Sequence, residues 1–157
     1  MPLFVLRRSA LRGTYTILLA CNRPFKLRIG KLGLVRLEKG YYFYTGSALG
    51  RGALSLEQRV ARHRRRNKRV KWHIDYLTVH DEIVIVNVIC TRNSRRLECK
   101  INRQILSNFD SEPVTRGAGS SDCKCSGHLL SVKLLNARIM VKRLERIYAI
   151  YGEPLFL

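Results

Sequence analysis

The chain has 157 residues, of which 46% are hydrophobic, so it has the size and apolar content of one domain with a single core. Thirty Lys and Arg against eleven Asp and Glu give a net charge of +19, far more than solubility requires. The excess indicates an anionic partner, and nucleic acid is the first class to consider. We therefore predict one domain over residues 1–157.

Two classes of protein are disfavoured by the sequence. No apolar run approaches the roughly 20 residues that span a bilayer, and the first arginines follow the apolar residues instead of preceding them as in a signal peptide. We therefore expect a cytoplasmic protein that does not enter a membrane. An odd number of cysteines in such a chain argues against a disulfide framework and leaves metal ligands or buried thiols, at Cys21, Cys90, Cys99, Cys123 and Cys125.

The positive charge is concentrated in the first half of the chain. Residues 1–72 carry a net charge of +16 and residues 73–157 carry +3. Eight of the thirteen residues from 59 to 71 are basic, which is typical of a phosphate-contacting surface, although a solvated helix face or a localisation signal is the alternative. We predict that nucleic acid is bound by Arg51, Arg62, Arg64, Arg65, Arg66, Lys68, Arg69 and Lys71.

The first half also has the composition of an antiparallel sheet. Residues 14–21, 26–29 and 34–37 are rich in β-branched and apolar side chains, residues 41–45 are aromatic, and glycines separate the segments. Residues 82–90 have the composition and length of a buried strand, and residues 129–134 are predicted as the last strand.

Helices are predicted between and after these strands. Ser55 and Gln58 match a capping box, which predicts a helix over 56–66. A short helix or a turn is expected at 72–77, a longer helix at 95–107 with an apolar stripe, and a C-terminal helix at 137–151 ended by Gly152. Residues 110–127 form a loop rich in Ser and Gly, long enough to suggest a function. The predicted class is α+β, or mixed α/β, with a small antiparallel sheet flanked by helices.

Polar side chains suited to phosphodiester chemistry recur in this pattern. The tripeptide Gly-Thr-Tyr ends at Tyr15, and the tripeptide Tyr-Thr-Gly begins at Tyr44. Arg59 and His63 lie four residues apart, so they share one helix face. Glu98 is the best candidate for a metal-binding acid, because the other early acids lie in a hairpin and in a first helical turn.

These features together resemble the GIY-YIG endonuclease superfamily. The two tripeptides resemble its signature, with threonine where the signature has isoleucine, and Arg59, His63 and Glu98 stand where the family has its arginine, helix histidine and metal-binding glutamate. The segments KGYYFYTGSALG, WHIDYL, LEC and SSDCKCSGHL extend the resemblance over residues 12–130, toward a small archaeal branch of Uri-like endonucleases.

The resemblance implies a role for each residue in a DNA endonuclease of repair, recombination or defence. Tyr15 would be the general base, with its pKa lowered by the metal or by Arg59, and Arg59 would clamp the phosphate. Glu98 would hold one Mg²⁺ or Mn²⁺, while Tyr44 and His63 would position the phosphate or relay protons. Hydrolysis would leave 5′-phosphate and 3′-hydroxyl ends.

Each residue also has an ordinary structural interpretation. The tyrosines could be strand aromatics, Arg59 and His63 a phosphate-binding face without catalysis, and Glu98 the partner of Arg95 or Lys100 on its own helix. A non-catalytic module that binds RNA or DNA is therefore the rival function. The DNA structure that is recognised and the oligomeric state stay open.

The last motif is a cysteine cluster. Cys99, Cys123, Cys125 and His128 offer ligands for zinc, but Cys-x-Cys-x2-His is tighter than the usual spacing, so we favour buried thiols in a loop packed over the site. Asp122 and His128 are alternatives for completing the active site. We expect Trp72, His73 and Asp75 to anchor the core, with substrate contact by His73 or Asp75 as the alternative.

Overall fold

The computed structural model describes residues 10–133 and 136–157, and it has the predicted α+β class. Its strands are β1 (Gly13–Cys21), β2 (Phe25–Arg28), β3 (Leu34–Leu37), β4 (Gly40–Ala48), β5 (Ile83–Arg92), β6 (Ser111–Pro113), β7 (Leu129–Val132) and β8 (Leu155–Phe156). Its α-helices are α1 (Leu56–Arg64), α2 (His73–Thr78), α3 (Glu98–Asn108) and α4 (Ala137–Ala149). None of the helices in the described ranges is long and apolar enough to cross a membrane.

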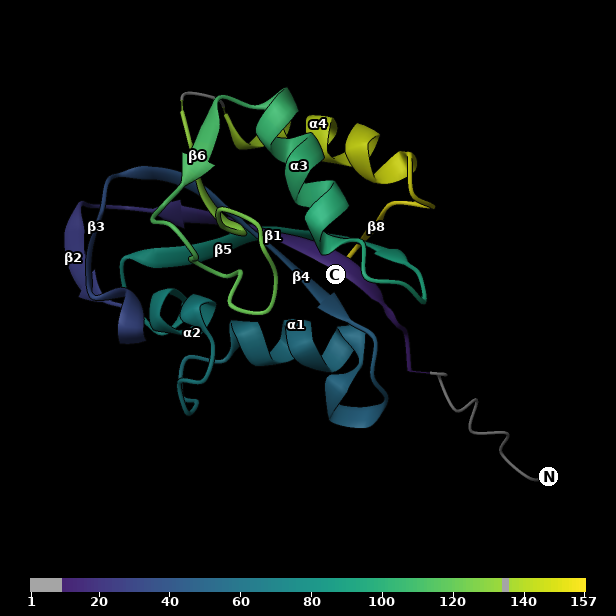
Figure 1. Ribbon diagram of the computed structural model, residues 1–157, viewed down its shortest axis with the longest axis horizontal. Coiled ribbons are helices and arrows are strands. Elements are labelled where there is room, and N and C mark those ends of the chain that lie inside the picture. The colour runs from purple at the N-terminus through teal and green to yellow at the C-terminus, as the bar shows by residue number, and fades with distance from the viewer. Residues whose placement is uncertain (1–9, 134–135) are drawn as a thin grey trace.

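The strands form one large and one small sheet. Six strands pair antiparallel in the order β6-β7-β4-β1-β5-β8, while β2 and β3 form a separate hairpin. Figure 1 shows α1 and α2 on one face of the large sheet and α3 and α4 on the other. The sheet is therefore the middle of three layers.

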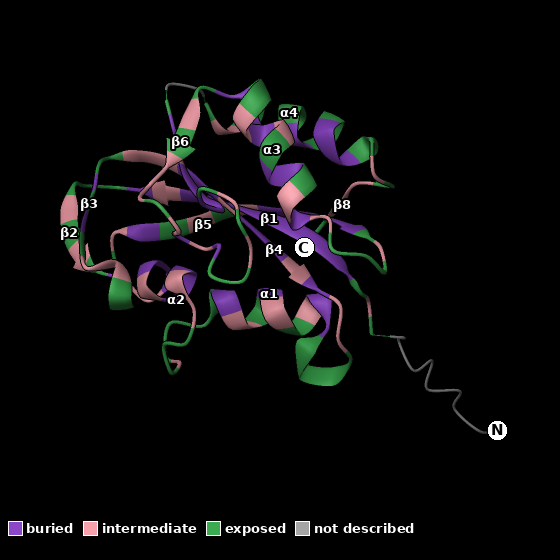
Figure 2. Ribbon diagram, viewed as in Figure 1, coloured by how far each residue is buried: buried purple, intermediate pink, exposed green. Residues whose placement is uncertain are grey.

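Each face of the sheet has its own apolar core. Alternate residues of a strand point to opposite faces, so Ile17 packs toward α1 and α2, whereas Leu18 packs toward α3 and α4. Figure 2 shows the buried residues concentrated in the central strands and on the helix sides that face them. The hairpin of β2 and β3 packs Val35 and Leu37 into the core on the side of α1 and α2, and its alternate side chains are exposed.

Several predicted boundaries were wrong. Helix α1 ends at Arg64, not at residue 66, because the side chain of Lys68 caps the carbonyls of Arg62 and His63. Ser55 is the N-cap, but its side chain makes no capping hydrogen bond, so the predicted capping box is absent.

The second half also departs from the predictions. Helix α3 starts at Glu98 instead of residue 95, and α4 ends at Ala149 instead of residue 151. The predicted loop at 110–127 contains β6, which pairs with β7. Strand β7 is followed by β8, so it is not the last strand, and residue 134 lies outside the described residues. In strand β5, Ile83 and the run from residue 88 to 91 are buried, whereas Val84 and Val86 are exposed.

A buried carboxylate joins α1, α2 and the chain between them. The Asp75 side chain is fully buried and accepts two hydrogen bonds from the Arg62 guanidinium, at 2.6 and 2.9 Å. The backbone amides of Lys71 and Trp72 donate to the same carboxylate, and the Lys68 ammonium lies 3.6 Å away. Burial raises the pKa of Asp75, but these hydrogen bonds outweigh it and hold the pKa below the ordinary 3.8.

Asp75→Asn should therefore destabilise the fold. The substitution leaves Arg62 and Lys68 without a counter-charge in a buried setting, which costs about 3 kcal/mol of unfolding free energy. Because the pKa of Asp75 is lower in the folded state, its contribution is complete above the unfolded pKa of about 3.9 and is lost as the pH falls below it. Urea unfolding at pH 7 and pH 3 measures both effects. Asp81→Asn, at an exposed carboxylate near Arg66, is the matched control, and an equal loss in both variants would contradict the assignment.

Candidate active site

The site lies beside the second half of β4, beyond the point where its pairing with β7 ends. Strand β7 pairs with β4 only along Tyr41 to Tyr44, so within the described ranges the rest of that edge of β4 has no strand partner. A cavity of about 540 Å³ opens there. Side chains from both faces of the sheet reach this edge, which is why α1 on one face and α3 on the other both contribute to the cavity.

The structure brings three of the predicted catalytic residues to the cavity wall. Tyr44 from β4, Arg59 from α1 and Glu98 from α3 line it directly. Tyr15 and His63 do not line it but lie beneath its floor, with their rings 6.4 and 5.9 Å from that of Tyr44. The five residues are therefore close together, in two layers.

Tyr15 is held under the floor by the strand register. Tyr15 on β1 faces Gly46 on β4, and a Cβ atom at Gly46 would lie 2.8 Å from the Tyr15 hydroxyl oxygen. Any side chain at position 46 would therefore collide with the Tyr15 phenol, and only glycine leaves room for it. The Tyr15 side chain is 1% exposed, and burial raises its pKa well above 10, with Arg59 opposing the shift only in part. Arg59 lowers the pKa of Tyr15, as predicted, but desolvation outweighs its effect, so the net shift is upward.

His63 connects Tyr15 to the buried carboxylate. Its Nε2 atom lies 2.7 Å from the Tyr15 hydroxyl, and its Nδ1 atom lies 4.0 Å from Oδ1 of Asp75. Burial and the neighbouring Lys68 lower the pKa of His63 to about 3, so the imidazole is neutral at physiological pH. A neutral imidazole can accept a proton at Nε2 from the phenol.

Arg59 is a cation without an acidic partner in the described structure. It lines the cavity, its buried Nε atom has no hydrogen-bond acceptor, and its guanidinium lies 5.0 Å from the centre of the Trp72 ring. Arg62 and Lys71 also contact that ring, at 4.3 and 5.4 Å. Trp72 thus supports the arginine by a cation–π contact and leaves its charge available to an anion in the cavity.

Glu98 presents a carboxylate from the first turn of α3. One of its oxygens accepts a hydrogen bond from the Ser47 hydroxyl, and the other accepts one from Arg96 at 2.7 Å. Arg96 also binds Asp122, so two carboxylates of the cavity wall share one guanidinium. The alternative pairing of Glu98 with Arg95 or Lys100 is not observed, because Arg96 takes that role.

Sequence reasoning missed some residues of this wall and underrated others. Ser47 and Arg96 were not singled out, although Ser47 directly follows the second tripeptide and Arg96 stands two residues before Glu98. His73 was expected in the core, but it lines the cavity and accepts a hydrogen bond from the Gly119 amide at 3.0 Å. Trp72 lines the cavity as well, whereas Asp75 is buried as expected.

The predicted nucleic-acid-binding set divides into internal and free cations. Arg62 and Lys68 bind Asp75 and backbone carbonyls, so their assignment to a phosphate surface was wrong. Arg66 donates to the carbonyls of His80 and Ile83, and Arg64 donates to that of Leu157. The remaining candidates are exposed, and in the described part of the chain their side chains make no ion pair or hydrogen bond: Arg51, Arg65, Arg69 and Lys71.

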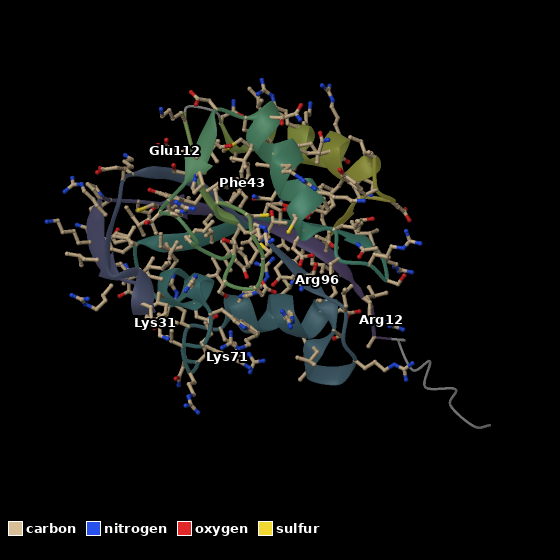
Figure 3. All side chains as sticks on the ribbon, viewed as in Figure 1. Arg12, Lys31, Phe43, Lys71, Arg96 and Glu112 are labelled. Atoms are coloured by element: carbon tan, nitrogen blue, oxygen red, sulfur yellow. The ribbon has the colours of Figure 1, made fainter. Side chains whose placement is uncertain are left out.

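The cysteine cluster forms a group of metal-ligand type. One ligand atom each from Cys99, Cys123, Cys125 and His128 lies within 4.8 Å of the others, and the four residues could hold a metal ion. The three thiols are only partly buried, so the favoured interpretation as buried thiols was wrong. Gly119, Ser121 and Asp122 of the loop predicted at 110–127 line the cavity. Figure 3 shows sulfur atoms gathered near the middle of the view, with the labelled Arg96 below them.

Gly46→Ala tests the close approach of Tyr15 directly. The added methyl group overlaps the phenol, so we expect a loss of about 1–3 kcal/mol of unfolding free energy and a displaced Tyr15 ring. The same substitution in a Tyr15→Leu background no longer meets the Tyr15 phenol and leaves only the Tyr44 ring, at 3.3 Å, close to the added methyl group, so most of its cost should disappear. A double-mutant cycle measured by urea unfolding gives the coupling, and a coupling of zero would show that Gly46 and Tyr15 do not constrain each other.

Comparison with known proteins places the chain in a family. Residues 14–149 match the model of the Domain of unknown function DUF123, and the matched segment contains the four α-helices, the strands of the large sheet except β8 and the first residue of β1, and the residues that line the cavity. No curated protein and no solved structure matches the chain significantly. The match covers well over half of the sequence, and the chain belongs to the DUF123 family.

Proposed function

We propose that this protein is a metal-dependent DNA endonuclease of the GIY-YIG superfamily, from the small archaeal Uri-like branch, that produces 5′-phosphate and 3′-hydroxyl ends. The observation that carries the proposal is the convergence of Tyr44, Arg59 and Glu98 on one cavity above the Tyr15–His63 pair. This combination supplies what phosphodiester hydrolysis requires: a cation for the phosphate, a carboxylate for a metal and a path for a proton.

Arg59 is suited to bind the scissile phosphate. Arg59 lines the cavity without a competing carboxylate in the described structure, and its guanidinium lies 5.0 Å from the centre of the Trp72 ring. A planar guanidinium can donate two parallel hydrogen bonds to the non-bridging oxygens. It would offset charge that accumulates on those oxygens in the transition state.

Tyr15 and His63 form a path for the proton of the attacking water. Because the pKa of Tyr15 is raised, the phenol is protonated at neutral pH and can take a proton from water only as it gives up its own. Nε2 of His63, at 2.7 Å, is placed to receive that proton, and the Asp75 carboxylate, 4.0 Å from Nδ1, would offset part of the cost that burial and Lys68 impose on the imidazolium. The path requires the phenol to reach the cavity beside Gly46.

The carboxylates of the wall fit a hard divalent cation. Mg²⁺ or Mn²⁺ prefers oxygen ligands and is commonly held by one or two carboxylates together with phosphate and water. Glu98 and Asp122 supply such oxygens, with the Ser47 hydroxyl beside them. The bound ion would stabilise the leaving 3′ oxygen. Arg96 donates hydrogen bonds to both carboxylates, so its guanidinium would have to give up part of these contacts before the carboxylates could hold the ion.

The free cations outline the surface on which DNA would lie. Lys71 lines the cavity, Arg51 precedes α1, and Arg65 and Arg69 belong to the segment that connects α1 with α2. Figure 3 labels Lys71 on the same side of the sheet as α1, with Arg96 between α1 and α3. A DNA backbone following these side chains would pass over Arg59.

One observation favours the rival function, a module that binds nucleic acid without cleaving it. The Tyr15 hydroxyl is almost fully buried, and a closed phenol cannot meet a water molecule in the cavity. Cleavage therefore requires a small opening at Gly46 when substrate binds, whereas binding alone requires none. Activity of wild-type and Tyr15-substituted protein separates the two functions.

Tyr15→Phe should slow cleavage strongly and leave DNA affinity unchanged. The ring keeps its packing, while the loss of the hydroxyl removes the proton path and costs on the order of 10² to 10⁴ in rate. With His63 as the final acceptor, the wild-type rate should vary little from pH 6 to 8, because the pKa of His63 is about 3. Single-turnover rates at matched DNA occupancy are the measurement. A tenfold rise in rate per pH unit would instead indicate free phenolate as the base, and an unchanged rate in the variant would remove Tyr15 from the mechanism.

The difference between internal and free cations predicts which of them contribute to DNA binding. Arg69→Ala together with Lys71→Ala should weaken binding to all sequences alike and reduce the salt slope by about two, because each phosphate contact releases counterions. Arg138→Ala with Lys142→Ala, on the exposed side of α4, removes the same charge on the opposite face of the sheet. Fluorescence anisotropy at several salt concentrations compares the pairs, and equal slopes would show that binding follows net charge alone.

A further inference from the structure

The cysteine cluster lies outside the proposed catalytic chemistry, yet it contacts the same cavity. Cys99 is the second residue of α3, Cys123 and Cys125 belong to residues 114–128 between β6 and β7, and His128 directly precedes β7. Three sulfur atoms and an imidazole nitrogen within 4.8 Å of one another are a common ligand set of structural zinc sites. All three cysteines are free thiols, so no disulfide competes for them.

The segment 114–128 has too small an apolar core to hold itself in place. Apart from Ala118, its buried residues are Ser120, Gly127 and His128, and its other side chains are mostly polar or small. It is ordered by backbone hydrogen bonds such as Gly117 N–H to the Ser126 carbonyl, at 2.8 Å, and by the bond from the Asn102 amide to the Gly127 carbonyl. A polar segment of this length gains little from hydrophobic burial, so a cross-link through a metal would supply the missing stabilisation.

We propose that Cys99, Cys123, Cys125 and His128 bind one zinc ion, and that this ion fixes the wall of the cavity. Two of the ligands directly adjoin carboxylates of the wall: Cys99 follows Glu98, and Cys123 follows Asp122. Zinc bound to both cysteines would fix the distance between the Glu98 and Asp122 carboxylates, which Arg96 contacts at the same time. Four protein ligands fill a tetrahedral shell and leave no position for water or substrate, so the ion is structural.

Neighbouring residues would thus bind two different kinds of metal ion at two separate sites. The thiolates and the imidazole select zinc, whereas the oxygen atoms of Glu98 and Asp122 suit magnesium or manganese. The zinc proposal does not depend on the nuclease proposal, because it concerns the shape of the cavity wall and not the reaction in it.

Zinc content and cobalt substitution test the site. Full-length protein purified without chelator should contain one zinc per chain, and Co²⁺ added to the metal-free protein should give the visible absorption of tetrahedral thiolate coordination. Cys125→Ser should lose both signals. Cys21→Ser is the matched control, because the Cys21 thiol donates to the Arg23 carbonyl away from the cluster and its loss should leave both signals intact. A wild-type chain that binds neither metal, or that forms a disulfide among these cysteines, would overturn the proposal.

Proteolysis tests the role of the ion in the wall. Arg116 and Lys124 are exposed cleavage sites for trypsin within the segment, whereas Lys26 and Arg36 are exposed sites far from it in the chain. Chelation should speed cleavage at the first pair on the order of tenfold and leave the second pair unchanged, because local opening governs the rate. Equal protection with and without zinc would exclude the structural role even if zinc binds. These measurements use no DNA, so a negative result would contradict the zinc proposal but not the nuclease proposal. A protein that binds zinc but does not cleave DNA would contradict the nuclease proposal alone.

Discussion

The buried carboxylate of Asp75 is the constraint on which the site depends. It draws Arg62 of α1, Lys68 and the amides before α2 to one point, in a segment where like charges would otherwise repel. Arg59 and His63 lie on the same short helix as Arg62, so their positions follow from that contact. The same clamp places Trp72 against Arg59 and sets Asp75 beside His63. A network that stabilises the fold thus also orients the cation and the imidazole of the proposed reaction.

The second constraint is the end of pairing along β4. A sheet normally separates what lies on its two faces, but an edge without a strand partner lets side chains from both faces meet. Tyr15 and Arg59 approach from the face of α1, while Glu98 approaches from that of α3. Gly46 at this edge allows the Tyr15 phenol to approach the cavity. The zinc site that we propose would complete the arrangement by fixing the segment that closes the cavity on its third side.

Local sequence patterns predicted the strands of the described residues except β6 and β8, and the motifs pointed to residues that the fold places near one another. The tripeptides at Tyr15 and Tyr44 and the Arg59–His63 spacing led to residues that the fold does bring together. The sequence could not show which cations of residues 59–71 are internal, because this depends on Asp75, which lies outside the run. It could not show that Cys99 meets Cys123, since only the packing of α3 on the sheet brings them together. The pKa of Tyr15 was also beyond prediction, because it depends on burial that no local pattern reveals.

The most direct test of the nuclease proposal is cleavage of end-labelled DNA with Mg²⁺, comparing wild-type protein with Glu98→Gln. The amide keeps the size of the side chain but removes the charge that would hold the metal, whereas the basic surface is unchanged. The account predicts Mg²⁺-dependent cleavage by the wild type, with ends that DNA ligase can rejoin, and loss of cleavage at undiminished DNA affinity in the variant. DNA binding without cleavage by the wild-type protein across linear, supercoiled and branched substrates, or full Mg²⁺-dependent activity in Glu98→Gln, would contradict it.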